Sequence, residues 1–436
     1  MDFDLNSLCR GCDFAELYAE RTETQSLELL DGVVSKAAHT LLQGVGIREL
    51  NGEKTRYTYY MPSRMPDWFE ANHPYCDVHA LTPAILHDME RQARTLDNRV
   101  VKVKAVVAST VTDVSISFCH TTNVGRTAEQ PVHDHRERHV LMLHVVLEQE
   151  GRHEMGFASI VLKEKPLHAM TDEERETTVK SLVQNALSQA DHLFRAITPQ
   201  GGDMPVVMAA GASGILLHEA IGHAFEADFN RQHTSIFSDK MGQKVCRSGI
   251  TIADDATLPF APGSFAYDDE GAPAQCTYLV HDGRLESYLH DHISAEHYGV
   301  KPTGNGRRQN FRHAPVPRMT NTYMLPGEAS EEDIIRSVKH GIYAQAFTNG
   351  QVQIGAGDFT FYLKTGFLIE DGHLTAPIRD VNIIGNGPRA LADISMVGNN
   401  LLLDPSAAFC GKAGQQVPVG QGIPTVRVDR LTVGGV

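Results

Sequence analysis

Residues 101–120 (VKVKAVVASTVTDVSISFCH) and 139–147 (HVLMLHVVL) decide the fold class of the first half of the chain. Both are rich in Val, Ile and Thr with stretches of alternation, which predicts β-strands. They lie between two segments of helical periodicity, residues 84–97 (AILHDMERQARTLD) and 172–197 (DEERETTVKSLVQNALSQADHLFRAI). Thr171, with acids behind it, is a typical N-cap for the second helix. The sequence therefore predicts a two-layer α+β domain.

A Pro- and Gly-rich segment, residues 198–205 (TPQGGDMP), follows the long helix directly. We expect a domain boundary there, with an N-terminal α+β domain at residues 1–200 and a C-terminal domain at residues 201–436. In the second domain, residues 278–285 (YLVHDGRL) and 367–374 (FLIEDGHL) carry Asp-Gly between apolar runs, the commonest signal of a type I′ β-hairpin. They indicate a largely antiparallel β domain. A helix is expected at Glu331–His340, closed by Gly341.

Composition excludes several classes of protein. The 436 residues include 39 Lys and Arg against 54 Asp and Glu, and this net charge of −15 offers no basic face for a nucleic acid. The longest weakly polar stretch, Met204–Leu217, is shorter than the ~20 residues that cross a bilayer, so no membrane span is expected. The N-terminal residues MDFDLNSLCRGCDF have acids where a signal peptide has Lys or Arg, which favours a cytoplasmic location.

Seven scattered cysteines, an odd number, favour reduced thiols over a disulfide framework. Cys9 and Cys12 form a C-x-x-C pair, but no second pair or nearby His completes a zinc site. We therefore interpret these two residues as ordinary thiols.

The strongest chemical signal is in residues 213–230 (SGILLHEAIGHAFEADFN), where His218 and Glu219 precede His223. Two imidazoles beside a carboxylate are the ligands and the base of a hydrolytic zinc site. The familiar H-E-x-x-H motif places its imidazoles about 40° apart around an α-helix, whereas the i, i+5 spacing here gives about 140°. A π-type turn near Gly222 would restore convergence, and such turns concentrate at functional sites.

A catalytic zinc site with one open position needs a third protein ligand. The sequence offers three candidates: Glu226 and Asp228, shortly after His223, and Cys410, between Gly-rich turns near the end of the chain. Spacing alone does not choose among them, and the two acids are equally consistent with solvated side chains.

Several longer stretches carry a resemblance to a known family. They are residues 43–57 (QGVGIRELNGEKTRY), 216–231 (LLHEAIGHAFEADFNR), 266–275 (AYDDEGAPAQ), 302–308 (PTGNGRR), 315–327 (PVPRMTNTYMLPG), 394–403 (ISMVGNNLLL) and 410–425 (CGKAGQQVPVGQGIPT). On these residues the chain resembles the TldD/PmbA family of metallopeptidases, and most closely its metal-binding TldD branch. The resemblance implies a Zn²⁺-dependent peptidase in which His218, His223 and Cys410 bind the metal and Glu219 is the general base. It also implies an N-terminal α+β domain followed by a largely β domain that carries the metal-binding helix.

The resemblance further implies extended or unfolded peptides as substrates, including peptide precursors and their leaders. They would be cut in a cavity enclosed by a homodimer, or by a heterodimer with a non-catalytic PmbA-like subunit. The alternative is a peptide-binding regulatory subunit with a structural or vestigial metal. Glu219 argues against it, because a structural site needs no general base.

Two further clusters of charged residues each have two interpretations. Arg307, Arg308, His313 and Arg318 form either a peptide-carboxylate or carbonyl-polarising site, or a solvated or interface loop. The acids at residues 268–270 are expected to be a turn with solvated side chains rather than a second metal site.

Overall fold

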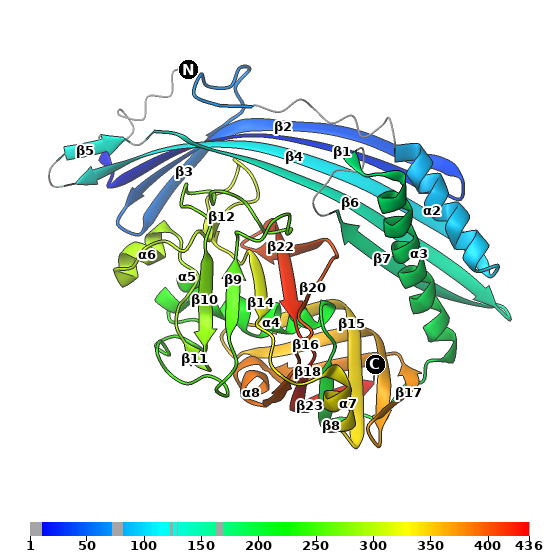
Figure 1. Ribbon diagram of the computed structural model, residues 1–436. Helices are drawn as coiled ribbons and strands as arrows, with labels where there is room; N and C mark the ends of the chain where they lie inside the picture. The colour runs from blue at the N-terminus through cyan, green and yellow to red at the C-terminus, as the bar shows by residue number, and fades with distance from the viewer. Residues whose placement is uncertain (1–10, 72–81, 123–124, 129, 163–168, 436) are drawn as a thin grey trace.

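The computed structural model describes residues 11–71, 82–122, 125–128, 130–162 and 169–435. Its first part is an antiparallel sheet that arches over the remainder of the chain (Figure 1). Its strands, in chain order, are β1 (Phe14–Leu30), β2 (Val33–Asn51), β3 (Lys54–Tyr60), β4 (Val100–Thr122), β5 (Gly125–Ala128), β6 (Val132–Gln149) and β7 (Arg152–Val161). The order across the sheet is β3-β2-β1-β4-β6-β7, with β5 paired to β4.

Two helices, α2 (Thr82–Leu96) and α3 (Asp172–Arg195), cover one face of this sheet. Alternate residues of β4 and β6, such as Val103 and Leu143, are fully buried against them. The predicted N-cap is confirmed, because Thr171 forms a reciprocal capping box with Glu174. The other face of the sheet is directed toward the C-terminal part of the chain.

The C-terminal part contains two further seven-stranded sheets and a two-stranded one. The strands of one large sheet are β9 (Ile252–Asp255), β10 (Cys276–His281), β11 (Arg284–Leu285), β14 (Asn321–Met324), β20 (Leu402–Leu403), β21 (Ala408–Lys412) and β22 (Gln415–Ile423). Those of the other are β8 (Gly202–Met208), β15 (His340–Gln353), β16 (Asp358–Glu370), β17 (His373–Ile378), β18 (Val381–Asn386), β19 (Ile394–Val397) and β23 (Val426–Gly435). The remaining short elements are β12 (Gly306–Arg307), β13 (Val316–Pro317), α6 (His292–Tyr298), α7 (Glu331–Arg336) and α8 (Gly387–Ala392).

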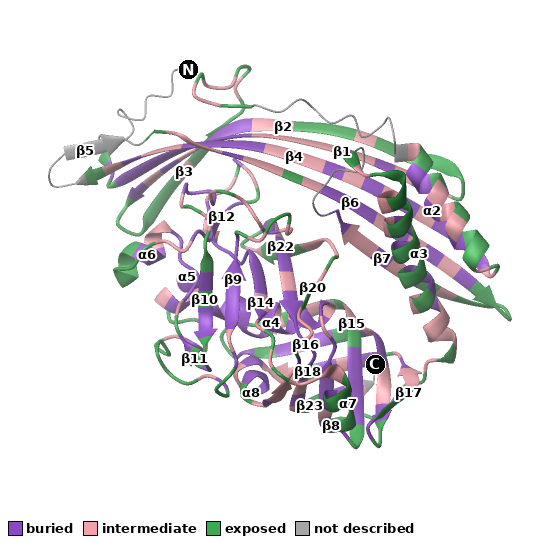
Figure 2. Cartoon of the chain, in the orientation of Figure 1, coloured by how far each residue is buried: buried purple, intermediate pink, exposed green. Residues whose placement is uncertain are grey.

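Residues 212–231 form a helical segment that contacts both large C-terminal sheets through β22, β15 and β16. One hydrophobic core joins the segment to these sheets. Figure 2 shows that β9 is buried along its whole length and that β14 is buried except at Tyr323. The segment that carries the histidine motif is therefore held from both sides.

The predicted fold class, α+β with mostly antiparallel sheets, is confirmed. Both Asp-Gly hairpins form, and their turns have the two positive φ angles of a type I′ turn: 45° and 79° at Asp282 and Gly283, 49° and 78° at Asp371 and Gly372. The domain boundary near residue 200 stays a prediction.

Two element boundaries were wrong. The helix expected at Glu331–His340 ends at Arg336, because the chain enters β15 at His340 and pairs there with β16. β6 begins at Val132, seven residues before the expected strand, because its polar side chains find partners across the sheet: His135 Nδ1 lies 2.8 Å from Asp113 Oδ1, and His139 Nδ1 lies 2.8 Å from Ser109 Oγ.

The cysteine prediction holds only in part. Cys12, Cys246, Cys276 and Cys410 form no disulfide, but Cys119 is disulfide-bonded, which corrects the expectation of reduced thiols at this residue. Spacing along the sequence does not show which thiols form disulfides in the folded chain. Cys9, of the C-x-x-C pair, lies outside the described residues. No helix within the described ranges has both the length and the apolar character that a membrane crossing requires.

Candidate metal centre

The histidine motif lies in a helical segment whose winding changes along its length. After a 3-10 turn η4 (Ala212–Gly214) and α4 (Ile215–Leu217), the chain forms a π-helical turn η5 (His218–Gly222), a 3-10 turn η6 (His223–Phe225) and α5 (Ala227–Arg231). A π-turn holds one extra residue, so side chains at i and i+5 can face the same side. The ring centroids of His218 and His223 lie 5.1 Å apart. The predicted π-type turn is confirmed.

Gly222 is needed for space rather than for backbone freedom. Its φ of −57° and ψ of −52° are those of an ordinary right-handed helix. A Cβ at this position would lie 2.2 Å from Met319 Sδ and 3.1 Å from the Leu217 carbonyl oxygen. Close packing against Met319 is therefore the reason for a glycine at this position.

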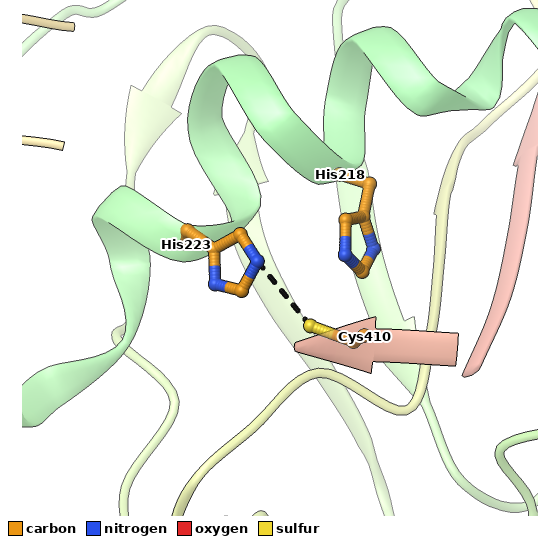
Figure 3. Close-up of side chains that lie close together, drawn as sticks. All are labelled: His218, His223 and Cys410. Carbon is orange, nitrogen blue, oxygen red and sulfur yellow. Dashed lines mark hydrogen bonds between the residues drawn. The ribbon is translucent and has the colours of Figure 1, made fainter. Parts of the chain in front are cut away.

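Cys410 reaches the two imidazoles from β21, which pairs with β22 through Cys410 and Val417. Its Sγ lies 3.2 Å from His223 Nε2 (Figure 3). His218, His223 and Cys410 are all buried, and each offers one ligand atom within 4.8 Å of the others. Of the three candidates for a third ligand, Cys410 is the one that joins the histidines; Glu226 and Asp228 do not.

The charges of the cluster favour a thiolate. Burial alone would raise the pKa of Cys410, but the neighbouring His218 and His223 outweigh it and hold that pKa well below its usual value. Burial would lower the pKa of His223, but Glu226 and Cys410 outweigh it and raise that pKa well above its usual value. Such a thiolate–imidazolium pair is ready to exchange its proton for a metal cation.

Glu226 contacts the Nδ1 side of the His223 ring, and Lys412 contacts Glu226. The Glu226 carboxylate accepts the Nδ1–H of His223 at 2.9 Å and lies 3.0 Å from Lys412 Nζ. Lys412 also donates to Asp228 at 2.7 Å. Burial opposes ionisation of Glu226, but Lys412 and His223 outweigh it and lower its pKa to about 2. Both acids are therefore bonded within the protein, and their interpretation as solvated side chains was wrong.

This arrangement sets the tautomer of His223. A carboxylate that accepts Nδ1–H leaves Nε2 as the nitrogen that faces Cys410 and is able to bind a metal. Arg318, fully buried, donates to the Cys410 carbonyl oxygen and so helps to fix the strand that carries the thiol.

Glu219 follows His218 directly and is half-buried. Burial raises the pKa of its carboxyl, although His218 and His223 partly oppose this. Within the described part of the chain its carboxylate makes no hydrogen bond or ion pair. A carboxyl with a raised pKa and no committed partner is suited to accept a proton and to release it again.

The donor set fits zinc. Ligand atoms placed tetrahedrally at 2.0–2.3 Å from a zinc ion lie about 3.3–3.8 Å from one another. The Sγ–Nε2 separation is already 3.2 Å, and the three donors lie within 4.8 Å, so a shift on the order of 1 Å would close the set. Two imidazoles and a thiolate are ligands that zinc prefers, and three protein ligands leave a fourth position open.

The arginine loop is buried rather than solvated. Arg307 donates to the carbonyl oxygens of Met319 and Pro418, and Arg308 pairs with Glu16 of β1. Arg318 lies beside Cys410, and burial is the main reason for the lowered pKa of the half-buried His313. Of the two alternatives for this loop, the interface is the one that its contacts match, because Arg308 joins the first sheet to the C-terminal part.

The acids at residues 268–270 are also buried, so the expectation of a solvated turn was wrong. Asp268 accepts the backbone N–H of Gly306 at 2.9 Å, Asp269 accepts from Arg136 at 2.8 Å, and Glu270 pairs with Arg48. The sequence missed these pairings because the arginine partners lie on distant strands. No second group of metal-ligating side chains occurs among the residues that the structure describes.

Comparison with known proteins agrees with this geometry. Residues 201–435 match the PmbA/TldA metallopeptidase C-terminal domain, and residues 15–61 match domain 1 of the same proteins. The chain belongs to the PmbA/TldA metallopeptidase family. The TldD/PmbA resemblance is thereby confirmed, and relatives named metalloproteases confirm the enzyme class, a peptidase.

Individual relatives cover different parts of the chain. A metalloprotease TldD homolog of Haemophilus influenzae is 36% identical over 99% of this chain and 95% of its own. A zinc metalloprotease TldD homolog of Saccharolobus solfataricus is 31% identical over 59% of this chain and 57% of its own. The crystal structure of TldE from Thermococcus kodakarensis superposes with a TM-score of 0.74 at 16% identity and 99% coverage of both chains, which shows a shared fold.

Proposed function

We propose that this chain is a zinc-dependent peptidase, with His218, His223 and Cys410 as metal ligands and Glu219 as general base. The convergence of three buried donors beside an uncommitted carboxylate carries the proposal. The name of the Saccharolobus relative supports zinc as the metal. The C-terminal domain, residues 201–436, would hold the whole centre.

The roles of the side chains follow from their positions. Bound zinc supplies a Lewis acid that polarises a carbonyl oxygen and lowers the pKa of a water molecule. Glu219 takes the proton of the attacking water and passes it to the leaving amine. Glu226 keeps His223 in the tautomer that presents Nε2, and Lys412 neutralises Glu226.

We further propose that the substrates are extended or unfolded peptides, including peptide precursors, in the cytoplasm. The active site would be enclosed in a dimer, either with a second copy or with a PmbA-like subunit. Enclosure would keep a hydrolytic centre away from folded proteins. Such a dimer should bury more than ~2,000 Å², as an obligate interface does. A stable monomer with full peptidase activity, or equal cleavage of folded and unfolded forms of one protein, would contradict the enclosure.

The decisive experiment combines metal analysis with peptide degradation. The purified chain should bind one zinc ion and degrade an unfolded protein. Glu219→Gln should keep the zinc and lose activity by a factor of about 10²–10⁴, since the base contributes on that order. The second candidate function, a non-catalytic peptide-binding subunit, predicts that wild type and variant bind peptide equally and cut none.

A further inference from the structure

A cavity of about 890 Å³ lies between the first sheet and the C-terminal part, on the side of β21 away from the metal centre. Side chains alternate along a strand, and Phe409 and Pro418 line this cavity while Cys410 and Val417 are buried in the core. The wall between the cavity and the candidate metal centre is thus the β21–β22 pair. A cavity of this volume is large enough for a segment of peptide.

The cavity has a polar floor and an apolar roof. In the floor, the register of β1, β4 and β6 aligns Thr24, Thr110 and Arg138 in one row across the sheet. The roof contains Phe260, of which 58% is exposed, and Phe409, of which 53% is exposed. Large apolar side chains left this open in a cavity are available to a ligand.

Four arginines line the cavity, and three of them are committed within the protein. Arg136 bonds Asp134 at 2.7 Å and Asp269 at 2.8 Å. Arg308 pairs with Glu16, and Arg307 donates to two backbone carbonyls. These side chains hold the walls together.

Arg138 is different. Its guanidinium lies 4.6 Å from the centre of the Phe409 ring, and it makes no hydrogen bond or ion pair with any residue of the described ranges. Burial lowers its pKa to about 10, with no neighbouring charge in opposition. The Arg138 side chain is half-buried, and its five N–H donors have no acceptor in the described part of the protein, so they are available to a ligand that enters the cavity. The acids nearby do not supply one: Glu20 accepts from Thr22 and the Phe311 N–H, and Asp134 pairs with Arg136.

We propose that Arg138 anchors a carboxylate of the peptide substrate in this cavity. The assignment rests on the proposed peptidase function. A guanidinium binds a carboxylate through two parallel hydrogen bonds. The hydroxyls of Thr24 and Thr110, in the same row, lie 3.3 Å apart and bond each other, which leaves one of the two as a further donor. The Phe260 and Phe409 rings accept an apolar neighbour of the acid.

Two sources of this carboxylate are possible in a peptide: an Asp or Glu side chain, and the C-terminus. Four fluorescent peptides of one sequence distinguish them, with Glu or Gln at one internal position and with a free or amidated C-terminus. Their dissociation constants would be measured by fluorescence anisotropy on the full chain carrying Glu219→Gln, so that bound peptide is not consumed.

We expect the peptide with the recognised carboxylate to bind about 10- to 100-fold more tightly than the peptide without it, as a charge-assisted hydrogen bond contributes. Arg138→Gln should remove this preference, and Arg138→Lys should keep part of it. Arg312→Gln, which removes an exposed arginine that does not line the cavity, should leave the preference intact.

Equal affinity for all four peptides, or an unchanged preference in Arg138→Gln, would overturn the assignment. The same peptides separate it from the peptidase proposal. Hydrolysis of all four by the zinc-loaded wild-type chain with equal KM would leave the peptidase standing and remove the anchor. A carboxylate preference in binding without any hydrolysis would support the anchor and contradict the peptidase.

Discussion

Glu226 and Asp228 both contact Lys412, which allows the role of Glu226 beside His223 to be tested separately from its pairing with the lysine. Glu226 and Asp228 both pair with Lys412, at 3.0 and 2.7 Å, but only Glu226 also accepts the Nδ1–H of His223. Glu226→Gln and Asp228→Asn each remove one negative charge from Lys412 and leave it the other. Glu226 also lies 4.0 Å from Arg318 Nε, so a difference in stability between the two variants reports both contacts, whereas a difference in zinc affinity reports the contact with His223.

The expected magnitudes follow from these contacts. Each variant replaces an ion pair with Lys412 by a hydrogen bond to an uncharged amide oxygen, which should lower the free energy of unfolding by about 1–3 kcal/mol. Loss of the carboxylate that orients a metal-binding imidazole typically weakens metal affinity by about 10- to 100-fold. We expect this loss in Glu226→Gln, whereas Asp228→Asn should bind zinc as tightly as the wild type.

Zinc affinity would be measured by competition with a chromophoric chelator, and stability by urea denaturation of the metal-free chain. Glu226→Asp, which keeps the charge on a shorter side chain, should regain part of the affinity. The reasoning fails if both variants lose zinc affinity equally, because a general loss of stability would then explain the effect. It also fails if Glu226→Gln binds zinc normally.

Three further predictions concern the packing of the metal-binding helix, the ligand set and the cavity. Gly222→Ala should lower the free energy of unfolding by about 1–3 kcal/mol through overlap with Met319. Because the two residues are in contact, Gly222→Ala should cost less in a Met319→Ala background than in the wild type, and additive effects in denaturation would contradict this packing. Cys410→Ala should abolish stoichiometric zinc binding in metal analysis, whereas Cys246→Ala, a buried thiol outside the cluster, should preserve it. Burial raises the pKa of Glu20 to about 7, so the folded chain retains a proton that the unfolded chain releases above pH ~4.5. The stability that the wild-type chain gains from this retained proton is present below pH ~4.5 and is lost as the pH rises through 7. In urea denaturation, Glu20→Gln should therefore match the wild type at pH 4 and be more stable by up to ~3 kcal/mol at pH 8. An equal change in the free energy of unfolding at both pH values would contradict the titration of Glu20.

The fold was predictable where the signal was local. Asp-Gly between apolar runs placed two hairpins correctly because the turn geometry depends on those two residues. The helix expected to reach His340 ended at Arg336, because pairing of β15 with β16 outweighs helical periodicity. The first residues of β6 were missed because polar partners across the sheet, not apolar alternation, hold them in a strand.

The candidate site was also predictable only where its signal was local in the sequence. The i, i+5 spacing of the histidines required a π-type turn, since a regular helix would separate the rings. The position of Cys410, 187 residues after His223, depends on the pairing of β21 with β22, and spacing could not choose it over Glu226 or Asp228. Arg308 was equally ambiguous, because its partner Glu16 lies 292 residues away.

The β21–β22 wall connects these two parts of the chain. Phe409 faces the cavity and Cys410 faces the histidines, so the proposed recognition of a peptide and the proposed binding of a metal would take place on opposite sides of one strand. Arg318 holds the carbonyl of Cys410 and Arg307 holds the carbonyl of Pro418 on the neighbouring strand. Because buried arginines fix the backbone of both strands, binding of a peptide in the cavity should not move the Cys410 thiol. Changes in the cavity should therefore alter which peptides bind without altering the affinity for zinc, and the two properties can vary independently within one fold.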